Sequence, residues 1–233
     1  MVKERVDSSI VQKIRSRQAR VAVLGLGFVG LAEAVAIAKS GLSVVGIDID
    51  ENKANSIKNG HSFTMDVHEK ELQLLLKKGS LGITTDFDPI RLADCVIICV
   101  PTPITVEGQA DNQYIRTAAR CIAERLDTPK LVVLESTCPP GTTRNLVLPI
   151  LEATGARVGQ DFFLAFAPDR IDPGSDRFNI KNTTRLVAGI TPRCIECACT
   201  FYSSVVERVE AVSSVEVAEM AKVLENCSAL NCW

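Results

Sequence analysis

The sequence lacks a long apolar run, and this absence bears first on membranes. No uninterrupted apolar stretch reaches the ~18 residues that a membrane-spanning helix needs. The first residues include Lys3, Glu4, Arg5 and Asp7, whereas a secretory signal would have an apolar core there. We therefore expect no membrane partner and a cytoplasmic location.

Clustered charge of one sign is also absent. The chain has 26 Lys and Arg against 28 Asp and Glu, so its formal net charge is -2, and the basic residues form no run. Nucleic-acid binding needs a basic patch or stripe. We therefore expect no nucleic acid as a partner.

Histidine is scarce, which bears on metal binding. The chain has two histidines, His61 and His68, and only Cys194, Cys197 and Cys199 among its cysteines have a metal-like spacing. This cluster falls in an expected helix with no histidine or second cysteine pair nearby. We therefore predict ordinary packing there and no metal site.

A glycine-rich turn near the N-terminus is the most informative feature present. Residues 20–30 read Arg-Val-Ala-Val-Leu-Gly-Leu-Gly-Phe-Val-Gly, an apolar run that leads into Gly25-x-Gly27-x-x-Gly30. A helix-like segment follows, and a second apolar run ends at Asp48, 18 residues after Gly30. Strand, glycine turn, helix, strand and acid in this order are the fingerprint of a dinucleotide site.

Each part of this fingerprint has a physical role. Gly25 permits the tight turn, Gly27 lets a pyrophosphate approach the backbone, and Gly30 lets helix and strand pack closely. The helix N-terminus offers unpaired N–H groups to the phosphates. Asp48 can bond a ribose 2′-OH and would repel a 2′-phosphate, which favours NAD over NADP. The alternative is a glycine turn that joins a strand to a helix without any ligand.

Beyond this unit, short apolar runs alternate with helical patterns. Strands are expected at 81–85, 95–100, 131–134, 162–166 and 185–187. Helices are expected at 7–17, 51–59, 68–77, 111–125 (with Asp111 as its N-cap), 141–153 (interrupted at Pro149), 192–203 and 214–226. This alternation predicts an α/β fold with a Rossmann-like, doubly wound parallel sheet.

Three loops that follow expected strands carry polar side chains. They span residues 101–103, 135–143 and 167–174, and together hold hydroxyls, carboxylates and an arginine. Ligands of such sheets bind beyond the carboxyl ends of the strands. We therefore predict that the loops form one site; the alternative is three proline-punctuated connections.

Six segments carry a resemblance to a known family. They are Gly-Leu-Gly-Phe-Val-Gly-Leu, Gly-Ile-Asp-Ile-Asp, Cys-Val-Pro-Thr-Pro, Leu-Glu-Ser-Thr-x-x-Pro-Gly-Thr-Thr, Pro-Asp-Arg-x-Asp-Pro-Gly and Val-Ala-Glu-Met-Ala-Lys-Val-Leu-Glu-Asn. The chain resembles the UDP-glucose/GDP-mannose dehydrogenases from residue 20 to about residue 226, in particular the bacterial UDP-N-acetylglucosamine and UDP-N-acetylmannosamine 6-dehydrogenases. The resemblance implies NAD as cofactor, a UDP-sugar as substrate and oxidation of the sugar C6 alcohol to a carboxylate with two NAD molecules.

The resemblance also implies roles for individual residues. The cofactor would contact Phe28 and Val29 through their backbone, and Asp48, Lys53, Thr102 and Thr137. The nucleotide sugar would meet Asp169, Arg170, Ile171, Lys222 and Asn226. Lys222 would stabilise the developing oxyanion, and Thr137 and Asp172 would orient the hydrolytic water. Lys222 and Asn226 lie four residues apart, on one face of a helix.

The sequence departs from the family pattern at several positions. Glu33 stands where the family has an apolar residue, and Cys138-Pro139 replaces a Thr-Tyr type pair. Asp169 and Ile171 stand where glutamate is usual.

The resemblance implies a division of the chain into three parts. We expect a helical arm at 1–19, an NAD-binding domain at 20–212 and the start of the family's central helix at 213–233. The second, UDP-binding domain, with its cysteine nucleophile, is expected to be absent. A homodimer is implied for the full-length family, and we do not extend it to this chain. The alternatives to an enzyme are a remnant that binds NAD without complete catalysis and a binding module.

Overall fold

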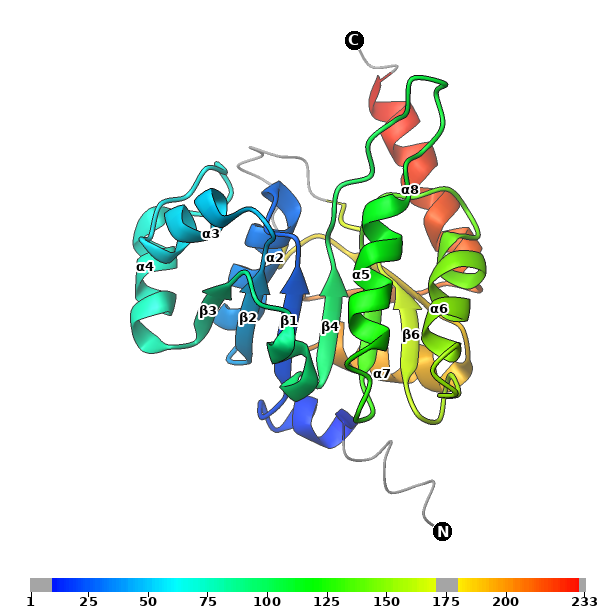
Figure 1. Ribbon diagram of the computed structural model, residues 1–233, viewed down its shortest axis with the longest axis horizontal. Coiled ribbons are helices and arrows are strands. Elements are labelled where there is room, and N and C mark those ends of the chain that lie inside the picture. The colour runs from blue at the N-terminus through cyan, green and yellow to red at the C-terminus, as the bar shows by residue number, and fades with distance from the viewer. Residues whose placement is uncertain (1–9, 171–179, 231–233) are drawn as a thin grey trace.

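The computed structural model describes residues 10–170 and 180–230. These residues form a central sheet of eight strands with helices packed around it (Figure 1). The strands are β1 (Arg20–Leu24), β2 (Ser43–Ile47), β3 (Leu81–Thr84), β4 (Cys95–Ile98), β5 (Leu131–Leu134), β6 (Phe163–Phe166), β7 (Arg185–Gly189) and β8 (Val209–Ala211). Their spatial order is β3-β2-β1-β4-β5-β6-β7-β8. The first six have the order of a Rossmann fold, which confirms the predicted fold class.

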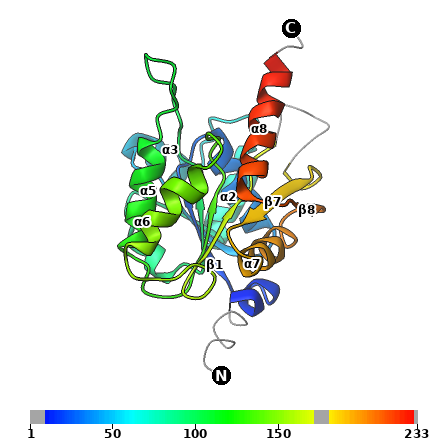
Figure 2. The same ribbon diagram turned by 90° about the vertical axis from the view of Figure 1, so that its right-hand side faces the viewer.

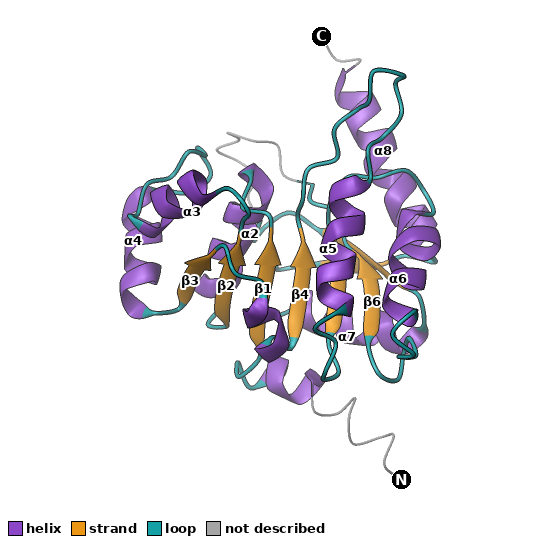
Figure 3. Cartoon of the chain, in the orientation of Figure 1, coloured by secondary structure: helices purple, strands orange, loops and turns teal. Residues whose placement is uncertain are grey.

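Helices cover both faces of the sheet (Figures 2 and 3). They are α2 (Phe28–Lys39), α3 (Glu51–Lys58), α4 (Glu69–Lys78), α5 (Gln113–Ala123), α6 (Leu148–Glu152), α7 (Pro192–Tyr202) and α8 (Val215–Leu230), with a 3-10 turn η1 (Asp88–Leu92) and a π-turn η2 (Thr143–Val147). Residues 10–15 are also helical, whereas 7–9 of the expected first helix lie outside the described residues. No helix in the described ranges has both the length and the apolar character needed to cross a membrane.

Successive residues of each strand pack alternately into two separate apolar cores, one on each face of the sheet. Val21 and Val23 of β1 pack with α2, α4 and α7, whereas Ala22 and Leu24 pack with α5 and α6 on the opposite face. Every residue of β4, β5 and β6 is buried. The predicted continuous apolar runs therefore reflect strands that are covered on both sides.

The far edge of the sheet departs from the parallel prediction. β7 pairs with β6 in antiparallel orientation, through Ala165 with Gly189 and Phe166 with Ala188. β8 then pairs with β7 in parallel. The sequence pattern identified β7 but carries no information on its direction. It missed β8, which has three residues, none of them buried.

Two local predictions about helix boundaries have different outcomes. The interruption near Pro149 takes the form of a change from the π-turn η2 to α6, with the proline at the second position of α6. Asp111 as the N-cap of α5 is wrong, because Asn112 occupies that position. The Asp111 carboxylate instead accepts a hydrogen bond from the Gln113 backbone N–H, at 2.9 Å.

A buried glutamate joins α8 to the segment after β5. Glu219 is fully buried and accepts hydrogen bonds from the backbone N–H groups of Gly141, at 2.5 Å, and Thr143, at 2.8 Å. The Thr143 hydroxyl donates a third, at 2.7 Å. The carboxylate thus pairs backbone donors at the start of η2, where an anion is also favoured by the helix dipole.

We expect Glu219→Ala to lower the free energy of unfolding by roughly 3 kcal/mol, because it leaves three buried donors without an acceptor. Chemical denaturation measures this change. Glu216→Ala, one turn earlier on α8, is the control: its ion pair with Arg144 is partly exposed, and its loss should cost less than about 1 kcal/mol. Equal effects of the two substitutions would contradict the capping role.

Candidate functional site

The polar loops meet at the carboxyl edge of the sheet, where β1 and β4 are neighbours but their connections diverge. Such a switch point is where open α/β sheets bind ligands. The glycine turn leaves β1 there, and the segments after β4 and β5 leave beside it. The Ser136 hydroxyl donates to the Val100 carbonyl, at 2.8 Å, and so ties the last two segments together.

Glycine occupies each of the three positions of the turn for a different physical reason. A Cβ on Gly25 (φ +86°) would lie 2.6 Å from the Cys99 carbonyl oxygen, and one on Gly30 would lie 1.8 Å from the Gly25 carbonyl oxygen. A Cβ on Gly27 would meet no atom within 4 Å. The fold therefore requires Gly25 and Gly30, whereas Gly27 leaves open space beside the backbone.

The start of α2 faces this space without a capping side chain. Gly27 is the N-cap, no side chain accepts a hydrogen bond from the first turn, and that turn contains no acidic residue. The Leu31 N–H donates a hydrogen bond to the Gly27 carbonyl, at 3.0 Å. Unpaired N–H groups, a helix dipole and open space suit a phosphate group.

Asp48 is fixed at the end of β2 beside the turn. Its side chain is buried and accepts hydrogen bonds from the backbone N–H groups of Leu26, at 2.8 Å, and Asp50, at 3.0 Å. The Lys53 ammonium pairs with the same carboxylate, at 3.1 Å. The structure thus brings together Asp48, Lys53 and the glycine turn, three parts of the predicted cofactor site.

An aromatic pair borders the turn, and the sequence analysis missed one of its members. Phe63, in the loop between α3 and α4, packs edge-on against Phe28, with ring centroids 5.7 Å apart. Their exposed fractions are 41% and 62%, and Ile49, after Asp48, is 69% exposed. An aromatic residue in a loop was the only available signal for Phe63, and it does not distinguish a site residue from a connection.

The remaining predicted cofactor residues lie at the same edge. Thr102 follows β4 and Thr137 follows β5, and each is half-buried. Neighbouring parallel strands end side by side, so these two threonines lie at the carboxyl edge on the β4 side of the switch point.

Among the residues expected to bind the sugar, Arg170 is engaged by α8. Its Nε donates to Glu225 Oε1, at 3.0 Å, and its guanidinium also donates to the Thr184 carbonyl, at 3.3 Å. Asp169 beside it is buried. Ile171 and Asp172 lie outside the described residues.

Lys222 and Asn226 lie one turn apart on α8, as predicted. Lys222 is half-buried and Asn226 is exposed. The helix rises beyond the carboxyl edge of the sheet (Figure 1). The pair between Arg170 and Glu225 places this part of α8 against the segment that follows β6.

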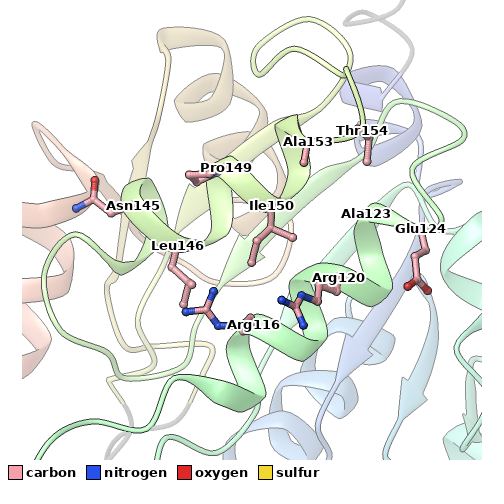
Figure 4. A pocket seen from close by; sticks show the side chains of 10 residues that line it. All are labelled: Arg116, Arg120, Ala123, Glu124, Asn145, Leu146, Pro149, Ile150, Ala153 and Thr154. Carbon is pink, nitrogen blue, oxygen red and sulfur yellow. The ribbon is translucent and has the colours of Figure 1, made fainter.

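A surface pocket of about 530 Å³ lies away from these residues, between α5 and α6 (Figure 4). Its walls are formed by Arg116, Arg120, Ala123, Glu124, Asn145, Leu146, Pro149, Ile150, Ala153 and Thr154. None of the predicted site residues lines it.

The cysteine cluster of α7 takes part in packing. Cys194 and Cys197 are buried, and Cys194 Sγ accepts a hydrogen bond from the Leu164 backbone N–H, at 3.3 Å. Among residues 10–170 and 180–230, no three His, Cys, Asp or Glu side chains gather in a way that could hold a metal ion.

The sequence matches one protein family over most of its length. Residues 19–206 fit the model of the NAD binding domain of the UDP-glucose/GDP-mannose dehydrogenase family. The chain is 35% identical to the UDP-N-acetyl-D-mannosamine dehydrogenase of Pyrococcus horikoshii and 34% identical to the UDP-N-acetyl-D-glucosamine 6-dehydrogenase of Pseudomonas aeruginosa. These matches cover 89% of this chain in both cases, and 50% and 49% of the relatives. The chain therefore spans about half the length of the curated relatives it matches.

Solved structures agree with this result. The UDP-D-ManNAc dehydrogenase of Pyrococcus horikoshii superposes with a TM-score of 0.83, and the match covers 89% of this chain and 50% of that one, at 35% identity. A ternary complex of GDP-mannose dehydrogenase from Pseudomonas aeruginosa also gives 0.83, over 91% of this chain and 50% of that one, at 29% identity.

We expect Gly27→Ala to weaken NAD binding by about tenfold or more, because the new methyl group would occupy the open space beside the turn. Its stability should change by less than about 1 kcal/mol, since no atom is displaced. Titration calorimetry and thermal melting measure the two effects.

Gly30→Ala is the comparison variant. We expect it to lose roughly 3 kcal/mol of stability or to fail to fold, because its Cβ would overlap the Gly25 carbonyl. Unchanged NAD affinity in Gly27→Ala would show that the space beside Gly27 does not receive the cofactor.

Proposed function

The chain belongs to the UDP-glucose/GDP-mannose dehydrogenase family, and we propose that it acts as the NAD-binding half of a nucleotide-sugar 6-dehydrogenase. The observation that carries this proposal is the carboxyl edge itself. It combines the open space at Gly27, the uncapped start of α2 and the fixed carboxylate of Asp48. These features suit a dinucleotide with a free ribose 2′-OH.

In this proposal the glycine turn and the neighbouring strand ends hold NAD. The backbone of Phe28 and Val29 would bind the pyrophosphate, and Asp48 with Lys53 would bind the adenosine ribose. Thr102 and Thr137 would contact the cofactor from the ends of β4 and β5. When bound, NAD supplies the acceptor for the two hydrides that leave C6 of the sugar.

The substrate class proposed is a UDP-N-acetylhexosamine. The names of several relatives, among them enzymes for UDP-N-acetyl-D-mannosamine and UDP-N-acetyl-D-glucosamine, support this class. Asp169, Arg170 and Ile171 would contact the nucleotide sugar. Lys222 and Asn226 would meet it from α8.

The proposed chemistry assigns two tasks to side chains of this chain. Lys222 would stabilise the negative charge that develops on the C6 oxygen, since a fixed cation stabilises an oxyanion most in a site that excludes water. Thr137 and Asp172 would orient the water that hydrolyses the activated sugar. The half-buried position of Lys222 supports its role.

A second candidate is a module that binds NAD without completing the oxidation. The observation that favours it is the family match itself, which falls on the NAD binding domain over residues 19–206. Both candidates should bind NAD, but only the dehydrogenase should form NADH.

The deciding experiment combines NAD titration with an assay of NADH formation by the purified chain. UDP-N-acetylglucosamine, UDP-N-acetylmannosamine and UDP-glucose are supplied in separate reactions. Sustained NADH formation would support the dehydrogenase, and the preferred sugar would define its substrate. NAD binding without NADH formation would mark the chain as a cofactor-binding half that does not complete the oxidation alone. Absence of NAD binding would contradict both candidates.

For the dehydrogenase, we expect Lys222→Ala to reduce the rate of NADH formation by at least about a hundredfold, because the oxyanion loses its cation. The Kd for NAD should change by less than about twofold, since Lys222 is assigned to the sugar. Lys78→Ala, at the exposed C-terminal end of α4, is the matched control and should leave both quantities unchanged. Normal turnover in Lys222→Ala would remove it from the mechanism.

A further inference from the structure

A fully buried ionic cluster lies directly behind the glycine turn. Glu33, one turn after Gly30 on α2, is completely buried, and its Oε2 accepts a hydrogen bond from Arg185 Nη2, at 2.7 Å. Arg185, at the start of β7, is itself only 4% exposed.

Glu135, at the end of β5, is the second acid of the cluster. The Tyr202 hydroxyl donates to its Oε1, and the Cys99 thiol donates to its Oε2, at 3.3 Å. Arg185 Nη1 lies 3.6 Å from Oε1. Arg185 therefore lies against both acids, with Nη2 on Glu33 and Nη1 near Glu135.

The charges of this cluster do not balance. The titratable and charged groups that face one another are Glu33 on α2, Cys99 after β4, Glu135 after β5, Asp169 after β6, Arg185 on β7 and Tyr202 on α7. The two carboxylates of Glu33 and Glu135, both ionised, and the one guanidinium of Arg185 would together have a charge of -1. Glu33 Oε1 is buried and accepts no hydrogen bond from any donor in the described residues. Two ionised carboxylates have no hydrogen to share, whereas a protonated one can donate to the other.

We propose that Glu33 and Glu135 share one buried proton and that this acid pair, together with Arg185, positions the strand-end segments of the cofactor site. The proton lies between the two carboxyl groups, so the two acids and Arg185 together have no net charge. Glu33 and Glu135 are positioning residues here, since neither reaches the open space at Gly27.

The contacts of the cluster explain how it positions the site. Cys99, which donates to Glu135, is also the residue against which Gly30 packs, since a Cβ on Gly30 would lie 3.1 Å from the Cys99 Cβ. Thr137 follows Glu135 by two residues. Arg185 Nη1 donates to the Pro168 carbonyl, at 3.3 Å, and so fixes the start of the segment that carries Asp169.

The titration of the acid pair predicts the direction in which the stability of the fold changes with pH. Burial raises the pKa of Glu33, and burial followed by the charge of Glu33 raises the pKa of Glu135 to about 8. A carboxyl whose pKa is higher in the folded chain than in the unfolded chain stabilises the fold most at low pH. This contribution is complete below the ordinary pKa of 4.5 and is lost as the pH rises through about 8. Burial also raises the pKa of Cys99 and Tyr202, so both stay protonated as donors.

The first test needs no ligand. Infrared spectra of the chain at about pH 6.5 should contain the C=O stretch of a buried carboxylic acid, which disappears in Glu33→Gln. The melting temperature of the wild type should fall by roughly 5 °C between about pH 6 and about pH 8.5. Glu33→Gln should lose most of this dependence, because Glu135 then has no neighbouring acid with which to share a proton and keeps Arg185 as its ion partner.

Two further variants keep the test decisive. Glu33→Leu restores an apolar residue and serves if the glutamine variant does not fold; it should flatten the pH dependence in the same way. Glu216→Gln is the control, since a hydrogen bond from Arg144 lowers the Glu216 pKa to about 2 and its charge is constant in the range tested. A wild type without the acid band, or a pH dependence of melting that Glu33→Gln and Glu33→Leu leave unchanged, would overturn the proposal.

The consequence for the cofactor rests on the proposed function and is measured separately. Loss of the proton adds a negative charge behind the turn that would hold the pyrophosphate, so the Kd for NAD should rise about fivefold between about pH 6.5 and about pH 8.5. This rise should be smaller in Glu33→Gln. A wild type that binds no NAD at any pH would contradict the proposed function and leave the infrared and melting tests intact. A wild type that binds NAD equally at both pH values would contradict the positioning role.

Discussion

Burial of both faces of the parallel sheet is the constraint on which the rest of the structure depends. Every residue of the central strands β4, β5 and β6 lies in one of two apolar cores, so polar side chains can gather only where the strands end. At the carboxyl edge the glycine turn, Asp48 and the two threonines therefore come together from segments far apart in the sequence. The close approach of Gly30 to Gly25 fixes α2 against this edge and orients its first turn toward the open space.

Much of this arrangement could be predicted because it depends on local patterns. The apolar runs predict the strands, and the glycine spacing with Asp48 predicts the dinucleotide site. The direction of β7 and the existence of β8 could not be predicted, since both depend on pairing across the sheet rather than on residue type. Phe63 lacks a signal for the same reason: only the folded chain brings its ring against Phe28. Glu33 was visible as a departure, but its partner Arg185 lies 152 residues away.

Buried charge, rather than apolar packing alone, joins the parts that surround the edge. Glu219 connects α8 to the start of η2, and Glu135 connects α7, β7 and the end of β4 through its three neighbours. Such contacts are costly to break, because each partner is buried and would lose its hydrogen bonds. These buried contacts therefore define how the helices and strands sit against one another more uniquely than apolar packing alone would.

The link between Arg170 and Glu225 has a consequence for any anion that this edge receives. The guanidinium already has a carboxylate partner on α8, so a phosphate that approached Arg170 would compete with Glu225. The ion pair is partly exposed, so breaking it would weaken the binding of the phosphate by on the order of 1 kcal/mol. Glu225 would then lose its cation, and the end of α8 would lose a tether to the segment after β6. Binding of a phosphate to Arg170 would therefore release the end of α8 from the segment after β6.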